Sequence, residues 1–133
     1  MLSMKETYTK LVEEAKKVLT NSYAPYSGIH VASAILTRTG KVYLGVNVEN
    51  ASYGLTICAE RAAIASMVTS GDKEPVAVAI VTDYEKPLPP CGACRQVLAE
   101  FNPDIVVVMY SVKEGKIMVK SLRELFPYPM SLK

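Results

Sequence analysis

The chain has 133 residues, of which 50% are hydrophobic and 21% are charged. This length predicts one domain, residues 1–133, around a single buried core, and the ordinary composition excludes a largely disordered protein. The 15 basic and 13 acidic residues leave a formal charge of +2 without a clustered Lys or Arg stripe. We therefore expect no nucleic-acid partner.

The sequence shows no pattern for export or for membrane insertion. Lys5 and Glu6 place charges where a secretory signal needs an apolar stretch. The longest apolar runs, residues 76–81 and 105–109, are far shorter than the roughly 20 residues that span a bilayer. We expect no membrane contact and a cytoplasmic location, where disulfides are disfavoured and three cysteines point instead to a metal or a reactive thiol.

The first predicted element is a helix over residues 4–20, because Ser3 and Glu6 form a capping-box pattern ahead of apolar residues at helical spacing. Residues 24–28 are rich in turn formers, and Thr39-Gly40 then separates two strands of a predicted antiparallel hairpin. The later elements alternate helices and strands. From the hairpin onward the predicted segments are residues 29–38, 41–47, 58–70, 76–81, 91–101, 105–110, 116–119 and 121–125.

Several of these strands are apolar on both faces and are separated by helices. That pattern is typical of a sheet covered on each side. The predicted fold class is therefore α/β, a three-layer α/β/α sandwich with a mixed five-stranded sheet.

All three cysteines fall within two short motifs that open predicted helices, Cys58-Ala59-Glu60 and Pro90-Cys91-Gly92-Ala93-Cys94. Cys91 and Cys94, three residues apart, share one face of a helix, so two thiolates can bind one ion. A structural zinc normally has four protein ligands, and only His30 stands in reserve, in a strand where histidine is more often a core or edge residue. Three ligands with an open fourth position indicate a catalytic zinc site.

Other uses of these residues remain open. A Cys-x-x-Cys pair also occurs in redox proteins and zinc ribbons, and buried free cysteines are common. Glu60 suits the first turn of any helix, where the macrodipole favours an acidic side chain. A non-catalytic zinc-binding module is therefore the alternative to an enzyme.

Three thiolates on one Zn²⁺ leave a net charge of about −1, which weakens the acidification of a bound water. Two helix N-termini are expected to offset this charge, together with Arg61, which can donate hydrogen bonds to cysteine sulfur. Arg95 has the same capacity, but an arginine on the surface of the third helix is more often solvated.

Cys-x-Glu followed by Pro-Cys-x-x-Cys is the signature of zinc deaminases. With residues 23–27, 47–53 and 90–97, it makes nearly the whole chain resemble the cytidine deaminases of the small homotetrameric kind with a three-cysteine zinc site. The resemblance implies hydrolysis of cytidine and deoxycytidine to uridine and deoxyuridine plus ammonia, in pyrimidine salvage, with one zinc per chain. A deaminase acting on nucleic acid is disfavoured, because no basic segment is present to hold a polynucleotide.

The resemblance also implies a role for individual residues. Cys58, Cys91 and Cys94 bind the zinc, a hydroxide on the metal attacks C4 of the base, and Glu60 shuttles the proton. Asn47 and Glu49 are similar to the pair that binds the ribose hydroxyl, while Ala51 and Tyr53 complete the pocket of a neighbouring subunit in a homotetramer. The implied nucleoside contacts are Asn47, Glu49, Ala59, Ile29, Ala51 and Tyr53.

Two positions depart from the family pattern. Ile29 stands where an aromatic residue commonly packs on the nucleoside, and Met130 stands near a phenylalanine that reaches into another subunit. The first departure predicts a raised KM with little change in kcat. Residues 31–36 are similar to a strand of blasticidin S deaminases, so a modified cytosine nucleoside is the alternative substrate.

Overall fold

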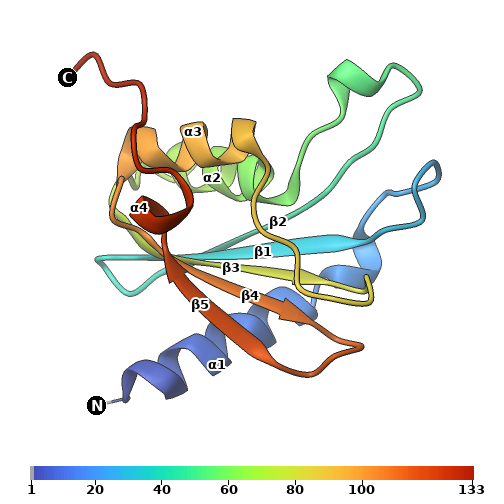
Figure 1. Cartoon of the computed structure of the whole chain (residues 1–133), viewed down its shortest axis with the longest axis horizontal. Helices are drawn as coiled ribbons and strands as arrows, with labels where there is room; N and C mark the ends of the chain where they lie inside the picture. The colour runs from blue at the N-terminus through green and yellow to red at the C-terminus, as the bar shows by residue number, and fades with distance from the viewer. Residues whose placement is uncertain (1) are drawn as a thin grey trace.

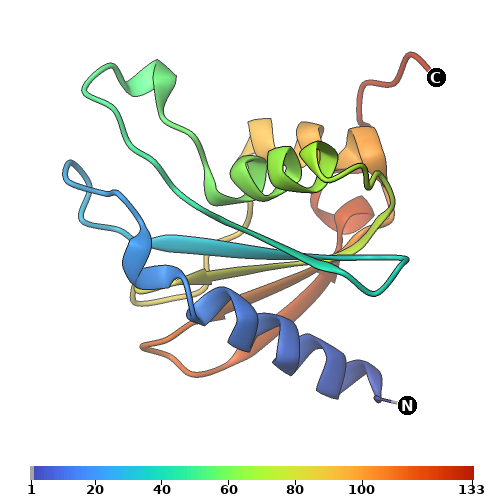
Figure 2. The same cartoon turned by 180° about the vertical axis from the view of Figure 1, so that it is seen from behind.

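The computed structural model describes residues 2–133 and has the predicted three layers. A five-stranded sheet lies between α1 on one face and α2, α3 and α4 on the other (Figures 1 and 2). Within residues 2–133, no helix combines the length and the apolar character needed to cross a bilayer. The elements in chain order are α1 (Met4–Lys16), a 3-10 turn (Leu19–Asn21), β1 (Val31–Thr37), β2 (Val42–Val46), a second 3-10 turn (Tyr53–Leu55), α2 (Ala59–Thr69), β3 (Pro75–Thr82), α3 (Gly92–Phe101), β4 (Val106–Ser111), β5 (Ile117–Ser121) and α4 (Leu122–Leu125).

The sheet has the strand order β2-β1-β3-β4-β5. Strands β3 and β4 pair in parallel, and the other neighbours pair antiparallel, which confirms a mixed sheet. A parallel pair needs a crossover connection, and α3 supplies it. The hairpin predicted around Thr39-Gly40 is also confirmed, as β1 and β2.

The strands that read as continuous apolar runs are buried on both faces. In β3, Val78 and Ile80 pack in the core beneath α2 and α3, whereas Ala77, Ala79 and Val81 pack in the core against α1. Successive side chains of a strand point to opposite faces, so each core takes alternate residues. With both faces buried, β3 has no polar face to show as an alternating pattern.

Helix α1 is shorter than predicted. The sequence pattern suggested residues 4–20, but the helix ends at Lys16 and the chain continues as the 3-10 turn Leu19–Asn21. The N–H of Val18 bonds the carbonyl of Ala15 at 3.1 Å, three residues back, which is the hydrogen bond of the tighter 3-10 turn. The spacing of apolar residues is similar in the α-helix and in the 3-10 turn, so the sequence pattern could not reveal where one ends and the other begins.

Gly45 in β2 lies directly against the start of α2. A Cβ at this position would lie 2.4 Å from the nitrogen of Ala63 and 2.5 Å from the carbonyl oxygen of Ala59, both backbone atoms. Backbone cannot rotate away, so we expect Gly45→Ala to reduce the free energy of unfolding by about 1–3 kcal/mol through overpacking. Thermal unfolding would measure this. Gly54→Ala is the matched control, because a Cβ there meets nothing within 4 Å. Equal melting temperatures for the two variants would contradict the close approach of Gly45 to the backbone of α2.

Candidate active site

The N-termini of two helices bring the three cysteines together. Cys58 is the N-cap residue of α2, Cys91 is the N-cap residue of α3, and Cys94 follows within α3. The Sγ atoms of Cys58 and Cys91 are 3.9 Å apart, those of Cys91 and Cys94 are 3.4 Å apart, and all three lie within 4.8 Å of one another. Zinc–sulfur bonds of about 2.3 Å at tetrahedral angles place sulfurs about 3.8 Å apart. The cysteine triad therefore has the dimensions of a zinc site.

Within residues 2–133, no histidine or carboxylate joins the triad as a fourth ligand. His30 is engaged elsewhere: its Nδ1 lies 2.7 Å from Oδ2 of Asp83, and its backbone N–H donates to Oδ1 of the same carboxylate at 2.8 Å. A structural zinc site is closed by four protein ligands, whereas a catalytic site keeps one position for water or substrate. The donor set fits the catalytic kind.

The local electrostatics favour an ionised sulfur at Cys58. Hydrogen bonding from the Cys94 thiol, and then from Cys91, lowers the pKa of Cys58 to about 6, with a smaller contribution from the charge of Arg61. The hydrogen bond to Cys58, together with burial, raises the pKa of Cys94, which is the donor of the pair. Two helix N-termini add partial positive charge beside the sulfurs. Arg61 is exposed, and within residues 2–133 its guanidinium makes no hydrogen bond to a cysteine sulfur, so its charge is its contribution.

Glu60 lies in the same cavity as Cys58 and Cys91. Cys58 has the extended backbone of an N-cap residue, φ −74° and ψ 152°, which confirms that it precedes the regular helix. Side chains two positions apart can then face one cavity. The Glu60 residue is only 5% exposed, and burial, assisted by the nearby Cys58 thiolate, raises its pKa to about 7. A carboxyl group that titrates near neutrality can both accept and return a proton there.

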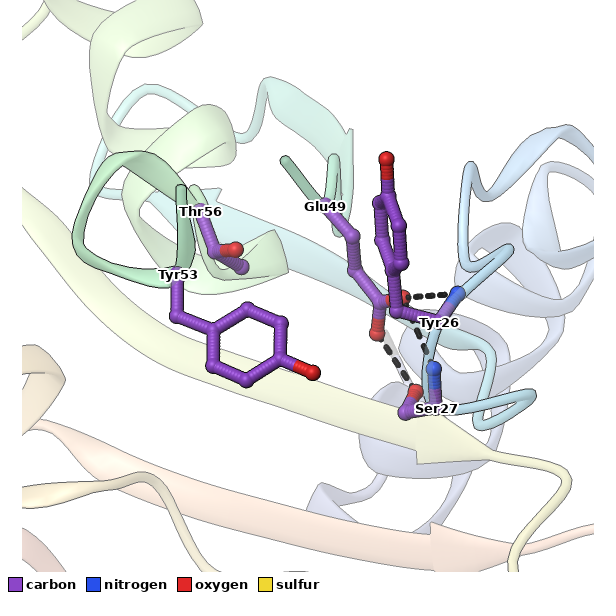
Figure 3. Close-up of a pocket in the computed structure, with 5 residues that line it drawn as sticks. All are labelled: Tyr26, Ser27, Glu49, Tyr53 and Thr56. Carbon is purple, nitrogen blue, oxygen red and sulfur yellow. Dashed lines mark hydrogen bonds between the residues drawn. The ribbon is translucent and has the colours of Figure 1, made fainter. Parts of the chain in front are cut away.

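The cavity beside the triad adjoins a second hollow. The first has a volume of about 180 Å³ and is walled by Asn47, Ala59 and Glu60 among others. The second, of about 320 Å³, lies between Glu49 and Tyr53 (Figure 3). Thr56 lines both, so the two hollows are neighbours.

Asn47 is 8% exposed, and nearby groups determine its orientation. Its Oδ1 accepts hydrogen bonds from the N–H of Val31, at 2.9 Å, and from the hydroxyl of Ser22, while its Nδ2 donates to the carbonyl of Ile29 at 3.0 Å. An amide nitrogen carries two hydrogens. The second N–H is therefore left for a partner in the cavity that Asn47 lines.

Glu49 holds the loop of residues 24–28. Its Oε1 accepts hydrogen bonds from the backbone N–H groups of Tyr26 and Ser27, both at 3.0 Å, and its Oε2 accepts one from the Ser27 hydroxyl (Figure 3). These bonds, with the Ser27 hydroxyl contributing most, hold the pKa of Glu49 below its ordinary value. The side chain is therefore a carboxylate at neutral pH, and it retains one unused lone pair, on Oε2, in a residue that lines the second hollow.

The other residues named from the sequence lie apart from the triad. Tyr53 is 78% exposed, and its ring meets Tyr26 edge to face with centroids 6.4 Å apart (Figure 3). Ala51 is exposed in the loop just before it. Ile29 lines a different hollow of about 190 Å³, together with Asp83, so the structure does not bring it into the Glu60 cavity. Its contact with a nucleoside stays a prediction.

Near the triad, the sequence did not point to Thr56, and it gave the wrong surroundings for Arg95. Thr56 lines both hollows. The sequence offered one indication of this, a hydroxyl side chain two positions before the ligand Cys58. Arg95, expected to be solvated, is half-buried and donates hydrogen bonds to the carbonyls of Pro90, at 2.8 Å, and Leu125, at 2.6 Å. Sequence spacing gives no indication of such contacts, because the partners are main-chain atoms.

Comparison with known proteins matches this architecture and this site. Residues 5–110 match the family described as the cytidine and deoxycytidylate deaminase zinc-binding region. The cytidine deaminase of Halalkalibacterium halodurans is 44% identical over 117 residues, which cover 88% of this chain and 89% of that protein. The blasticidin-S deaminase of Bacillus cereus is 32% identical over 126 residues, 89% of this chain and 88% of that protein. The crystal structure of cytidine deaminase from Burkholderia pseudomallei matches with a TM-score of 0.86 at 43% identity, covering 92% of this chain and 98% of that one.

Proposed function

This chain belongs to the cytidine and deoxycytidylate deaminase family, and from that premise we propose that it hydrolyses cytidine and deoxycytidine to uridine and deoxyuridine with release of ammonia. The observation that carries the proposal is one cavity lined both by a buried carboxyl group, Glu60, and by Cys58 and Cys91, two members of a zinc-sized cysteine triad. We assign the activity to a single catalytic domain, residues 1–133, acting in the cytoplasm as part of pyrimidine salvage. A reducing compartment suits the activity, because zinc binding needs the cysteines as thiolates.

In this mechanism Cys58, Cys91 and Cys94 would hold the zinc, which when bound lowers the pKa of a water and so supplies a nucleophile near neutral pH. Glu60 accepts one proton from the water and delivers it to N3 of the base, then accepts the second proton, from the hydroxyl now bonded to C4, and delivers it to the leaving amine. Water oxygen bonds to C4, the bond from C4 to the exocyclic nitrogen breaks, and ammonia departs. The raised pKa of Glu60 supports this role, because the group exchanges a proton at little cost near neutrality.

We assign the sugar to the junction of the two hollows, where Asn47 lines the first and Glu49 lines the second. Asn47 has one N–H left to donate, and Glu49 has a carboxylate that accepts, so a ribose hydroxyl can accept from the first and donate to the second. Thr56, which lines both hollows, lies between this position and the Glu60 cavity. The main-chain start of α2 at Ala59, fully buried, forms the wall against which the base would lie.

Ser27→Ala is expected to change the pH dependence of nucleoside binding. The Ser27 hydroxyl contributes most to lowering the pKa of Glu49, so its loss moves that pKa back toward the ordinary value of 4.5. The carboxylate contact exists above the pKa of Glu49 and is lost as the pH falls through it. The acid rise in KM for cytidine should therefore occur at higher pH in Ser27→Ala than in the wild type or in Ser131→Ala, a serine of the exposed tail. Superimposable KM profiles would remove Ser27 from this role.

We propose that the protein acts as a homotetramer in which Ala51 and Tyr53 close the pocket of a neighbour. The 78% exposure of Tyr53 supports a partner surface, because large aromatic side chains are enriched at interfaces. Light scattering is expected to give four chains per particle. A monomer that deaminates cytidine would contradict this assembly.

A substrate panel tests the proposed activity. Zinc content would be measured on the same protein, and turnover of cytidine, deoxycytidine and blasticidin S would be followed by the loss of cytosine absorbance. We expect cytidine and deoxycytidine to be turned over. Faster turnover of blasticidin S would instead assign the modified nucleoside, and one zinc per chain with no turnover of any cytosine nucleoside would favour a non-catalytic module.

A further inference from the structure

The ligand Cys91 follows a segment, residues 85–90, that makes few hydrogen bonds to the rest of the protein. Residues 83–91 connect β3 to α3 without regular structure, and prolines at positions 87, 89 and 90 remove three N–H donors. Within residues 2–133, the single hydrogen bond made by residues 85–90 is the one that the Pro90 carbonyl accepts from Arg95. Pro90 is buried, and within the described residues the bond from Arg95 is the one hydrogen bond that orients the chain as it enters Cys91.

The guanidinium of Arg95 donates hydrogen bonds to two main-chain carbonyls, one at Pro90 and one at the end of α4. Its Nε donates to the carbonyl of Pro90 at 2.8 Å, and its Nη1 donates to the carbonyl of Leu125 at 2.6 Å. The guanidinium is planar and rigid, so the two carbonyls are kept in a fixed relation. Its backbone N–H also bonds the carbonyl of Cys91 at 2.9 Å. Arg95 thus contacts the ligand and the residue before it.

The Leu125 carbonyl, which accepts the second hydrogen bond from Arg95, belongs to a well-packed helical turn. Leu125 is the last residue of α4, where a helix leaves carbonyls without intrahelical partners. Leu122 of the same turn is fully buried in the core beneath α2 and α3. Ser121 and Glu124 cap the start of the turn through reciprocal hydrogen bonds. The Leu125 carbonyl is therefore an anchored acceptor.

We propose that Arg95 is a positioning residue that sets Cys91 for zinc binding by fastening Pro90 to the C-terminal turn α4. The inference rests on the zinc site proposed above and adds the residue that keeps one ligand in place. It also couples the metal site to a segment some 30 residues downstream, α4, which carries no ligand.

Zinc release into an excess of the chelator 4-(2-pyridylazo)resorcinol, without nucleoside, tests the proposal. Groups that orient metal ligands are typically worth about 10- to 100-fold in metal affinity or activity, so Arg95→Met should release zinc about 10 to 100 times faster than the wild type. In Arg95→Lys the compact ammonium group cannot bond both carbonyls at once, so zinc release is expected at a rate between those of the wild type and Arg95→Met. Arg123→Met is the matched control, because it removes an arginine of α4 whose partner is the exposed Asp104. It should release zinc at the wild-type rate.

A second readout separates positioning from simple stabilisation. Arg95→Met should lower kcat and leave KM for cytidine nearly unchanged, because Asn47 and Glu49 lie in the connection that follows β2, away from α3 and α4 in the chain. Wild-type zinc release from folded Arg95→Met would overturn the proposal, even if its metal-free form melted at a lower temperature. If Arg95→Met does not fold, Arg95→Lys decides in the same assay, and a wild-type rate there would overturn it. The release assay contains no nucleoside, so its outcome is independent of whether cytidine proves to be the substrate.

Discussion

Glu60→Gln is expected to keep the zinc and the fold while lowering turnover by about 10²- to 10⁴-fold or more, the range in which general acid–base catalysis contributes. Glutamine has nearly the same shape but cannot take the proton from water or deliver it to N3 and the leaving amine. The loss should appear in kcat, since the contacts that bind the sugar are unchanged. Turnover and zinc content would be measured on the same preparations.

The stability of the metal-free protein gives an internal check on Glu60. Its folded pKa, about 7, is above the ordinary 4.5, so folding favours the protonated group. The stability that this group contributes is present below pH 4.5 and is lost as the pH rises through 7. Zinc-free Glu60→Gln should lack this loss and should be at least as stable as the wild type above pH 7.

Glu100→Gln makes the same chemical change at an exposed position near the end of α3 and should retain full turnover. Near-wild-type turnover in zinc-loaded Glu60→Gln would remove Glu60 from the mechanism. Loss of zinc from that variant would show that its role is to support the metal site.

Cys94→Ala is expected to abolish zinc retention and turnover together. Cys94 is fully buried, its Sγ lies 3.4 Å from that of Cys91, and among the described residues it is one of only three side chains in the metal-sized cluster. Two remaining ligands make a weak zinc site, whereas three or four are usual in proteins. The fold should persist, because the buried side chains of both cores do not depend on the sulfur. Zinc content after gel filtration, turnover and circular dichroism would measure the three effects.

Ala93→Ser is the control for Cys94→Ala, because position 93 lies between two ligands but is exposed. It should retain both zinc and turnover. A Cys94→Ala protein that still holds one zinc per chain and deaminates cytidine would exclude Cys94 as a ligand.

The layers of the fold could be predicted because local patterns specify them. Ser3 and Glu6 do form a capping box at the start of α1, and Thr39-Gly40 does separate the strands of a hairpin. The apolar run of β3 correctly indicated a strand buried on both faces. The predicted end of α1 was wrong. Apolar residues have similar spacing in an α-helix and in a 3-10 turn, and the two differ in their hydrogen bonds.

The cysteine triad could be predicted because each motif holds its residues within one helix start. What the sequence could not supply are side-chain contacts between distant segments. Glu49 is fixed by Ser27, 22 residues away, and Arg95 binds Leu125, 30 residues away. The partners are often main-chain groups, which every residue carries, so no residue type marks them. The position of Ile29 in a different hollow is hidden for the same reason.

The most direct test of the account is to titrate zinc back into metal-free protein while following the deamination of cytidine. The central claim is that the sulfurs of Cys58, Cys91 and Cys94 hold the metal beside the Glu60 carboxyl group, and that both are needed. Turnover is predicted to be absent without metal, to rise in proportion to added zinc and to reach its plateau at one zinc per chain. Full turnover by the metal-free protein, or one tightly bound zinc with no turnover of any cytosine nucleoside, would contradict it.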